Sequence, residues 1–147
     1  MKFRKMMGVT AAFLCAALAL SGCGSTDETA YRIGIVQQDE HSSLDAATQG
    51  FEDKLMELLG EENVTFDYQN AQGEQANSTT IATKFVSDGC DLILANGTTA
   101  LQSAAAATAD IPIVGTSVTD YIAAGAVNSN EKPGTNVTGV SDLVEIK

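Results

Sequence analysis

The chain has 147 residues, which is enough for one domain with its own hydrophobic core, and a formal net charge of −11. This charge repels phosphate backbones, so the composition argues against nucleic-acid binding. Three cysteines and one histidine provide neither a disulfide framework nor a recognisable zinc site.

The N-terminus has the parts of a secretory signal peptide. A basic start precedes an apolar run from Val9 to Leu20, which is shorter than the roughly 20 residues of a membrane-spanning helix. Ser21-Gly22-Cys23 follows and resembles the bacterial lipobox, in which the cysteine is acylated and becomes the mature N-terminus. We therefore expect a lipoprotein signal peptide over 1–22 and a lipid anchor on Cys23, which holds the protein at the extracytoplasmic face of the cell membrane. The alternative is an ordinary signal peptide with a chance cysteine.

After a polar tether over 23–30, apolar patterns predict alternating strands and helices. β-branched runs predict strands at 31–36, 63–68, 91–95 and 111–115, and the chain then continues to the segment 136–140. Apolar residues at spacings of three and four predict helices at 42–60, 74–88 and 98–109, with a weaker helical stretch at 121–127. Ser42 and Asp45 match a capping box at the start of the first helix.

This alternation predicts an α/β fold, a parallel sheet with helices on both faces, built from right-handed βαβ units. Such sheets bind ligands at the carboxyl ends of their strands, near the point where the strand order reverses. The loops that the rule selects are 38–44, 69–73, 96–99 and 116–120.

Groups in these loops suit a small zwitterion. Thr98 and Thr99 open a helix, whose free N–H groups and positive dipole end accept a carboxylate. Plain helix capping explains the two threonines equally well. Asp120 and Glu40 can pair with an ammonium group or remain solvated.

Catalytic motifs are incomplete. The sequence has no Gly-rich phosphate loop, and the run from Gly115 to Thr119 lacks the closing glycine of a nucleophile elbow. His41 is the single histidine and the available base for Ser117, although either can serve a ligand or a loop instead. We expect no catalysis, no cofactor and no metal, and keep an exported Ser117–His41 hydrolase as an alternative. Cys90 is expected to be a small, semi-buried residue in a helix-to-strand turn.

Eight segments occur in the order typical of one protein family. They are Tyr31-Arg32-Ile33-Gly34-Ile35, Glu40-His41-Ser42-Ser43-Leu44-Asp45, Phe66-Asp67-Tyr68-Gln69-Asn70-Ala71-Gln72-Gly73, Ile81-Ala82-Thr83-Lys84-Phe85-Val86, Asp91-Leu92-Ile93-Leu94-Ala95, Ile111-Pro112-Ile113-Val114, Val118-Thr119-Asp120 and Asn136-Val137-Thr138-Gly139-Val140-Ser141-Asp142. Together they resemble the substrate-binding lipoproteins of ABC importers, in the branch associated with tryptophan and other aromatic amino acids. The resemblance covers nearly all of residues 31–143.

The resemblance implies a periplasmic-binding-protein type of fold, in which two α/β lobes close over a small-molecule solute, here an amino acid, for delivery to ABC permease subunits. It implies that 31–140 form the N-terminal lobe and that 141–147 begin the hinge toward a second lobe. We expect that lobe to be missing, so that this fragment binds weakly. The implied ligand-binding residues are Glu40, His41, Leu44, Thr98, Thr99, Ser117, Val118 and Asp120, with Ser141 and Asp142 at the hinge.

Two departures from the family pattern leave the ligand open. Ser42-Ser43 replaces an expected proline-containing pair, and Tyr121 stands where proline usually follows the aspartate. Tyr121 can form an aromatic wall of the ligand site or simply shield the edge of the lobe. A receptor for a sugar or another small solute and a free-standing flavodoxin-like protein are the remaining alternatives.

Overall fold

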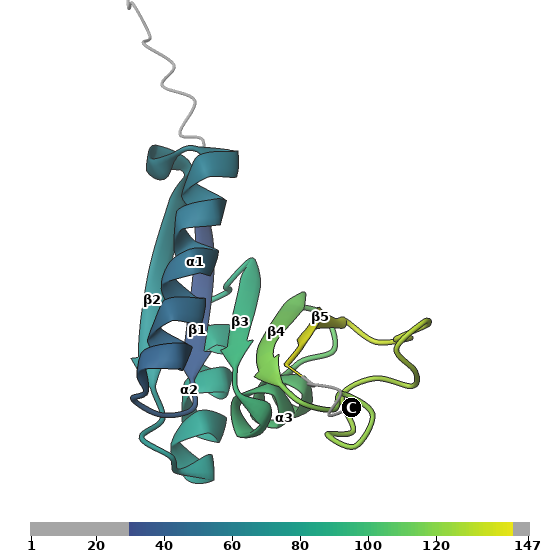
Figure 1. The fold of residues 1–147 in the computed structure, drawn as a ribbon. Coiled ribbons are helices and arrows are strands. Elements are labelled where there is room, and N and C mark those ends of the chain that lie inside the picture. Colours follow the sequence, from purple (N-terminus) through teal and green to yellow (C-terminus); the bar gives the residue numbers. More distant parts are fainter. Residues whose placement is uncertain (1–29, 143–147) are drawn as a thin grey trace, which may run out of the picture.

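The computed structural model describes residues 30–142, which form a five-stranded parallel sheet with helices on both faces (Figure 1). The elements are β1 (Tyr31–Gln37), α1 (Ser42–Leu59), the 3₁₀ turn η1 (Glu61–Asn63), β2 (Val64–Asn70), α2 (Gln75–Ser87), β3 (Leu92–Asn96), α3 (Thr98–Ala107), β4 (Ile113–Val118) and β5 (Val137–Ser141). The predicted signal peptide, the predicted lipid anchor on Cys23, most of the predicted tether and positions 143–147 lie outside the described residues. Within them, no helix combines the length and apolarity needed to cross a membrane.

The strand order is β2-β1-β3-β4-β5, and every neighbouring pair is parallel. The predicted α/β sheet is therefore confirmed. The chain first moves from β1 to one side and then returns to place β3 on the other side, so the order reverses between β1 and β3. The carboxyl ends of strands at such a reversal are the usual ligand position in folds of this kind.

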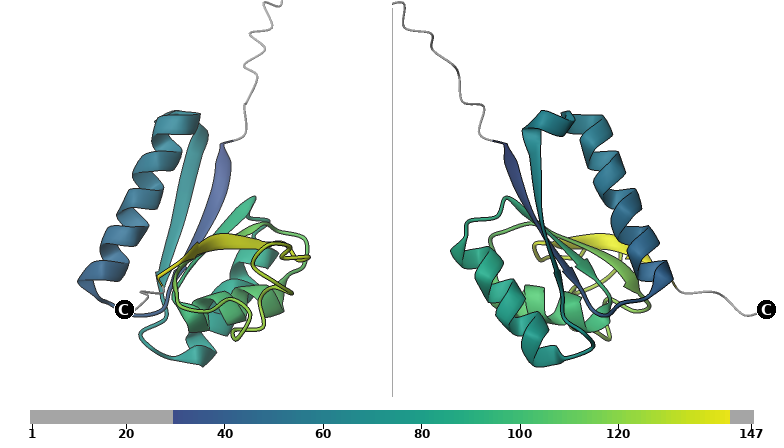
Figure 2. Two further views of the ribbon diagram at one scale, coloured as in Figure 1. Left: turned by 45° about the vertical axis from the view of Figure 1, so that its right-hand side comes forward. Right: turned by 90° about the vertical axis from the view of Figure 1, so that its left-hand side faces the viewer.

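Two apolar layers hold the helices on the sheet. Figure 2 shows α1 on one face and α2 with α3 on the other. Because side chains alternate along a strand, Ile33 and Ile35 pack under α1 while Val36 packs under α2 and α3. Phe85 of α2 is fully buried and lies against Gly34 of β1, where a Cβ atom would come within 2.6 Å of the ring. A glycine in this strand therefore lets an aromatic side chain approach the backbone.

Two sequence predictions near the C-terminus are wrong in detail. β4 continues to Val118, so Thr116 and Ser117 belong to the strand and the loop starts later than expected. The stretch 121–127 forms a turn and no helix. The N–H of Gly125 bonds the Ile122 carbonyl and the N–H of Ala126 bonds the Tyr121 carbonyl, with Gly125 at φ +72°. This hydrogen-bond pattern is that of a Schellman motif, and it stops the chain from continuing into the predicted helix.

Candidate functional site

The predicted site residues line one edge of the sheet, at the carboxyl ends of β1, β3, β4 and β5, which we call the carboxyl edge. Backbone hydrogen bonds join the segments along this edge. Gln38 N–H donates to the Asn96 carbonyl at 2.9 Å, and Gly97 N–H donates to the Thr116 carbonyl at 2.9 Å. Asp142 N–H donates to the Val118 carbonyl at 3.1 Å. The structure therefore arranges the predicted loops in one continuous row.

The loop after β1 carries Glu40, His41 and Leu44. His41 is the N-cap of α1, because its Nδ1 accepts the N–H of Ser43 at 3.2 Å and lies 2.8 Å from the Ser43 hydroxyl. The predicted capping box at Ser42 is therefore wrong by one residue, since an imidazole nitrogen takes the role expected of a serine oxygen. Glu40 and His41 are exposed, while Leu44 is half-buried at the start of the helix.

The loop after β3 leads directly into α3. Its N-cap is Gly97 at φ +110°, a backbone conformation that favours glycine. Among the described residues, no side-chain hydroxyl of Thr98 or Thr99 caps this helix. The Thr99 N–H instead donates to Gln38 Oε1 at 3.0 Å, so one of the free amides at this helix end already holds an oxygen acceptor.

Gln38 is a site residue that sequence reasoning missed. It follows Gln37 at the end of β1, and the two adjacent side chains point to opposite faces of the sheet, as strand alternation requires. Gln37 bonds residues of α1, whereas Gln38 bonds the start of α3. Two adjacent glutamines at a strand end were the feature of the sequence that could have drawn attention to Gln38. The role of Gln38 is identified only by its contact with Thr99.

The end of β4 is irregular at Ser117. The pairing with β5 shifts register between Gly115 and Val118, and Ser117 has φ +56°. A bulge and a non-glycine residue with a left-handed backbone change the direction of the neighbouring side chains at a cost in free energy. Both features are frequent beside functional sites. Ser117 is half-buried, while the side chain of Val118 is fully buried in the core. The side chain of Val118 therefore cannot contact a ligand, and a contact with this residue would have to be made by its backbone.

Beyond β4, Asp120 organises the following turn. Its Oδ1 accepts the N–H groups of Ile122 and Ala123, both at 2.9 Å. The Asp120 carboxylate remains exposed at the edge. Beside it, the hydroxyl of Ser141 donates to the Thr119 carbonyl at 2.8 Å, and this bond brings the predicted hinge residues next to the end of β4.

Tyr121 shields the sheet and does not form an open aromatic wall. It is 7% exposed, and its hydroxyl donates to the Val140 carbonyl at 2.9 Å. Its ring lies over Gly115 and Gly139 of adjacent strands, where added Cβ atoms would collide with it. Burial raises the pKa of the Tyr121 phenol above its ordinary value. Of the two roles left open by the sequence, the structure supports the shielding role.

Two hollows lie at the carboxyl edge among the described residues. One, of about 570 Å³, is lined by the acidic residues Asp39, Glu40 and Asp45 together with Tyr68. The other, of about 470 Å³, lies along β5 and the turn that contains Asp120.

No group of three or more His, Cys, Asp or Glu residues in the described stretch could hold a metal ion. Cys90 lies between α2 and β3 as predicted, but at 4% exposed it is buried and not semi-buried, and this burial raises the pKa of its thiol.

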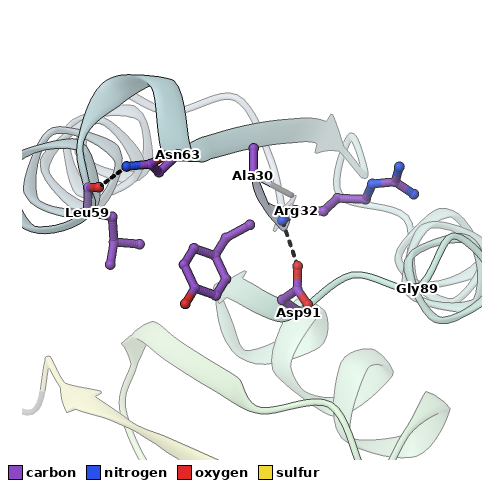
Figure 3. A pocket seen from close by; sticks show the side chains of 7 residues that line it. Ala30, Arg32, Leu59, Asn63, Gly89 and Asp91 are labelled. Carbon is purple, nitrogen blue, oxygen red and sulfur yellow. Dashed lines mark hydrogen bonds between the residues drawn. The ribbon is translucent and has the colours of Figure 1, made fainter. Parts of the chain in front are cut away.

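A further open cavity of about 730 Å³ lies at the opposite edge, at the amino ends of β1 and β3 (Figure 3). Its polar groups already bond one another. Asp91 Oδ2 accepts the Arg32 N–H at 2.8 Å, and Asn63 Nδ2 donates to the Leu59 carbonyl at 2.8 Å. None of the predicted site residues lines this cavity. We therefore assign the candidate site to the carboxyl edge.

Comparison with known proteins relates the chain to transport. The family model described as ABC transporter substrate binding protein matches residues 32–147. A curated relative from Clostridioides difficile (strain R20291), named Tyrosine-binding protein, is 41% identical, and the match covers 99% of this chain and 46% of the relative. The chain thus spans about half the length of this relative.

Solved structures with a similar fold include a substrate binding protein and an ABC domain. The ligand-free, open structure of a substrate binding protein with adhesive properties from Clostridium difficile matches with a TM-score of 0.76 and 47% identity, over 79% of this chain and 40% of that one. An ABC domain in complex with L-Trp from Streptococcus pneumonia matches with a TM-score of 0.74 and 38% identity, over 78% of this chain and 39% of that one. A conserved domain protein from Vibrio cholerae matches with a TM-score of 0.74 and 41% identity, over 77% and 39% of the two chains.

Proposed function

The chain belongs to the ABC transporter substrate binding protein family, and on this premise we propose that it binds an amino acid at the carboxyl edge for delivery to an ABC permease. The family match over residues 32–147 supports the transport role. A relative named for tyrosine binding and a similar structure that holds L-Trp favour an aromatic amino acid.

The observation that carries the proposal is the start of α3 at the strand-order reversal. The backbone N–H groups of Thr98 and Thr99 lie at the positive end of a helix dipole, which attracts a carboxylate. Gln38 Oε1 now accepts the Thr99 N–H, so an incoming carboxylate oxygen has a neutral amide oxygen to displace. The exposed carboxylates of Glu40 and Asp120 supply negative charge for the ammonium group of the same ligand.

We propose that residues 31–140 form one lobe of a two-lobed receptor and that Ser141 and Asp142 begin the connection to the other lobe. The proposal is supported by the match to about half of each relative. A single lobe supplies one wall of a cleft, whereas small-molecule sites typically bury 70–90% of their ligand. Affinity would then depend on domain closure around the solute.

The proposal also includes a lipid anchor on Cys23 at the extracytoplasmic membrane face. The basic start, the apolar run and the small residues before Cys23 support it. In a bacterial host fed an alkyne-labelled palmitate, the wild-type chain is expected to carry the label and to sediment with membranes. The Cys23→Ala variant is expected to lose both properties, and retention of the label by this variant would disprove the anchor.

Catalysis is not part of the proposed function. In the described stretch no hydrogen bond joins His41 to Ser117, and His41 Nδ1 is engaged by Ser43. A Ser117→Ala variant is expected to leave ester hydrolysis at the background rate of the wild type. A loss of turnover in this variant would support the hydrolase alternative.

A sugar receptor is the main rival. Sugar sites commonly use an exposed aromatic ring as a stacking surface. The Tyr121 ring is buried against Gly115 and Gly139 and cannot serve in this way. Tyr68 is 43% exposed and lines the hollow beside Glu40, so it is the ring that a sugar would use. Substitution of Tyr68 by Ala should therefore abolish sugar binding if the rival is correct and leave the amide contacts at α3 intact.

A nitrogen-15 NMR titration of the chain tests the proposal, since it detects the weak binding expected of one cleft wall. L-Tryptophan and L-tyrosine at millimolar concentration should shift the amide resonances of Thr98, Thr99 and Ser117. The resonances of Asp91 and Gly89 at the opposite cavity should not move, and glucose should move none. Shifts confined to the opposite cavity, or shifts produced by glucose alone, would contradict the proposal.

A further inference from the structure

Three buried polar side chains lie between α1 and the sheet, beside the carboxyl edge, and we call them the polar cluster. Gln37 and Asn96 are fully buried and Thr48 is 6% exposed. Gln37 and Asn96 are register partners at the ends of β1 and β3, so their side chains leave the sheet on the same face. Thr48 reaches them from α1, the helix that covers this face.

The Thr48 hydroxyl joins the two amides. It donates to Gln37 Oε1 at 2.8 Å and accepts from Asn96 Nδ2 at 2.9 Å. These two bonds use both hydrogen-bonding roles of the hydroxyl and fix the orientation of both amides. Asn96 Nδ2 also donates directly to Gln37 Oε1, but at 3.4 Å this bond is longer than either bond of Thr48. Thr48 therefore makes the shorter connections of the polar cluster.

The remaining amide hydrogens hold both ends of the loop after β1. Gln37 Nε2 donates to the Asp39 carbonyl at 2.9 Å and to Asp45 Oδ1 at 2.7 Å. Asn96 Nδ2 donates to the Leu44 carbonyl at 2.7 Å. Residues 39–44, which contain Glu40 and His41, are thus tied at one end to Gln37 of β1 and at the other to Asn96 of β3, the strand that leads into Thr98 and Thr99.

Stability alone does not account for this arrangement. Buried amides cost free energy unless every polar atom is bonded, and apolar residues of similar shape are often at least as stabilising. Asn96 Oδ1 is buried without a hydrogen-bond partner in the described part of the chain, so the cluster retains some of this cost. Buried networks of this kind do, however, impose one geometry on the segments they join.

We propose that Thr48 is a positioning residue: through Gln37 and Asn96 it holds the loop 39–44 at a defined place relative to Thr98 and Thr99. The loop 39–44 and the start of α3 then keep a constant separation. This separation sets the affinity of the proposed amino-acid site for the zwitterion. The inference rests on the proposed function for its effect on affinity, and on the hydrogen bonds alone for its effect on the loop.

Hydrogen exchange of the full chain without ligand tests the positioning role. Thr48→Val keeps the shape of the side chain and removes both bonds of the hydroxyl. Amide hydrogens of residues 39–46 should then exchange roughly tenfold faster, which corresponds to the loss of one typical hydrogen bond. Exchange in α2 should remain unchanged, and Thr48→Ser should restore wild-type exchange.

Ser78→Ala is the matched control. Ser78 is a fully buried residue of α2 whose hydroxyl has no hydrogen-bond partner in the described stretch. This variant removes a buried hydroxyl on the other face of the sheet and should leave exchange of residues 39–46 as in the wild type. Unchanged exchange in Thr48→Val, or equal acceleration throughout the chain, would overturn the positioning role.

The same variants, titrated with L-tryptophan by NMR, separate the two proposals. Thr48→Val should bind about tenfold more weakly than the wild type, while Thr48→Ser and Ser78→Ala should bind equally well. Faster exchange with undiminished binding would refute the link between loop position and affinity. Faster exchange in Thr48→Val, with no binding of any amino acid by the wild type, would refute the proposed function and leave the positioning role in place.

Discussion

Gly34 and Phe85 form a pair whose substitutions should compensate each other. A Cβ atom at Gly34 would lie 2.6 Å from the Cγ and Cδ2 atoms of the fully buried Phe85 ring, whereas ordinary contacts lie at 3.4–4 Å. Gly34→Ala must therefore displace the ring, and overpacking of this kind costs about 1–3 kcal/mol. Phe85→Leu leaves unfilled space and costs about 1–2 kcal/mol on its own.

The double variant should be more stable than the sum of the two losses. The leucine frees the space that the alanine methyl group needs, and the coupling free energy of residues in contact is about 0.5–3 kcal/mol. Urea unfolding followed by circular dichroism measures each free energy of unfolding, provided that the m-value stays constant. A coupling of about 1 kcal/mol corresponds to roughly 3–6 °C in Tm for a domain of this size.

Gly50 supplies the control for this cycle. It lies in α1, is exposed, and has no atom within 4 Å of an added Cβ. Gly50→Ala should stabilise the chain by about 0.5–1 kcal/mol and should add simply to Phe85→Leu. Additive losses in the Gly34 and Phe85 cycle would refute the steric argument, as would a Gly34→Ala variant with wild-type stability.

Three further predictions concern backbone strain, pH dependence and a buried hydroxyl. Ser117→Gly should leave the free energy of unfolding unchanged or raise it by up to about 1 kcal/mol, because glycine adopts φ +56° without strain. The pKa of Asp67 is held below its ordinary value by a 2.5 Å hydrogen bond from Lys84, so its contribution to stability is complete above about pH 4 and is lost as the pH falls through the folded-state pKa. Asp67→Asn should therefore lose less stability than the wild type between pH 5 and pH 2 in urea unfolding. Tyr121→Phe removes the hydrogen bond to the Val140 carbonyl and should lower the free energy of unfolding by about 0.5–1.5 kcal/mol.

Simple controls accompany these variants. Thr138→Gly, at an exposed and regularly paired position of β5, should cost about 1 kcal/mol where Ser117→Gly does not. A loss of similar size at both positions would show that Ser117 is unstrained. If Asp67→Asn follows the wild-type pH dependence below pH 4, the ion pair with Lys84 does not contribute to acid stability. A Tm of Tyr121→Phe equal to that of the wild type would mean that water replaces the phenol at no cost.

The sequence predicted the fold because its signals are local. β-branched runs and apolar spacings of three and four placed the first four strands and the three helices, with small errors at their ends, whereas β5 was not predicted as a strand. Asp91 and Leu92 illustrate such an error, since the predicted third strand begins one residue before the observed one. The carboxyl edge was predicted as well, because the position of a ligand in a parallel sheet follows from the direction of its strands.

The details of the candidate site depend on contacts between residues far apart in the chain. The burial of Tyr121 requires glycines from two strands, and the hydrogen bond of Gln38 to the start of α3 joins segments 61 residues apart. The turn at 121–127 and the bulge at Ser117 likewise depend on the pairing of β4 with β5 and on a single glycine conformation.

The amino-acid sequence by itself therefore determined the order of elements, the parallel sheet and the edge at which its loops gather. Only the tertiary structure decided which polar groups at that edge are already bonded, as Thr48 is by Gln37 and Asn96, and which remain available to a ligand. The reason is physical: periodicity along the chain records which face of an element is buried, whereas a hydrogen bond between two elements exists only once both have been packed in register.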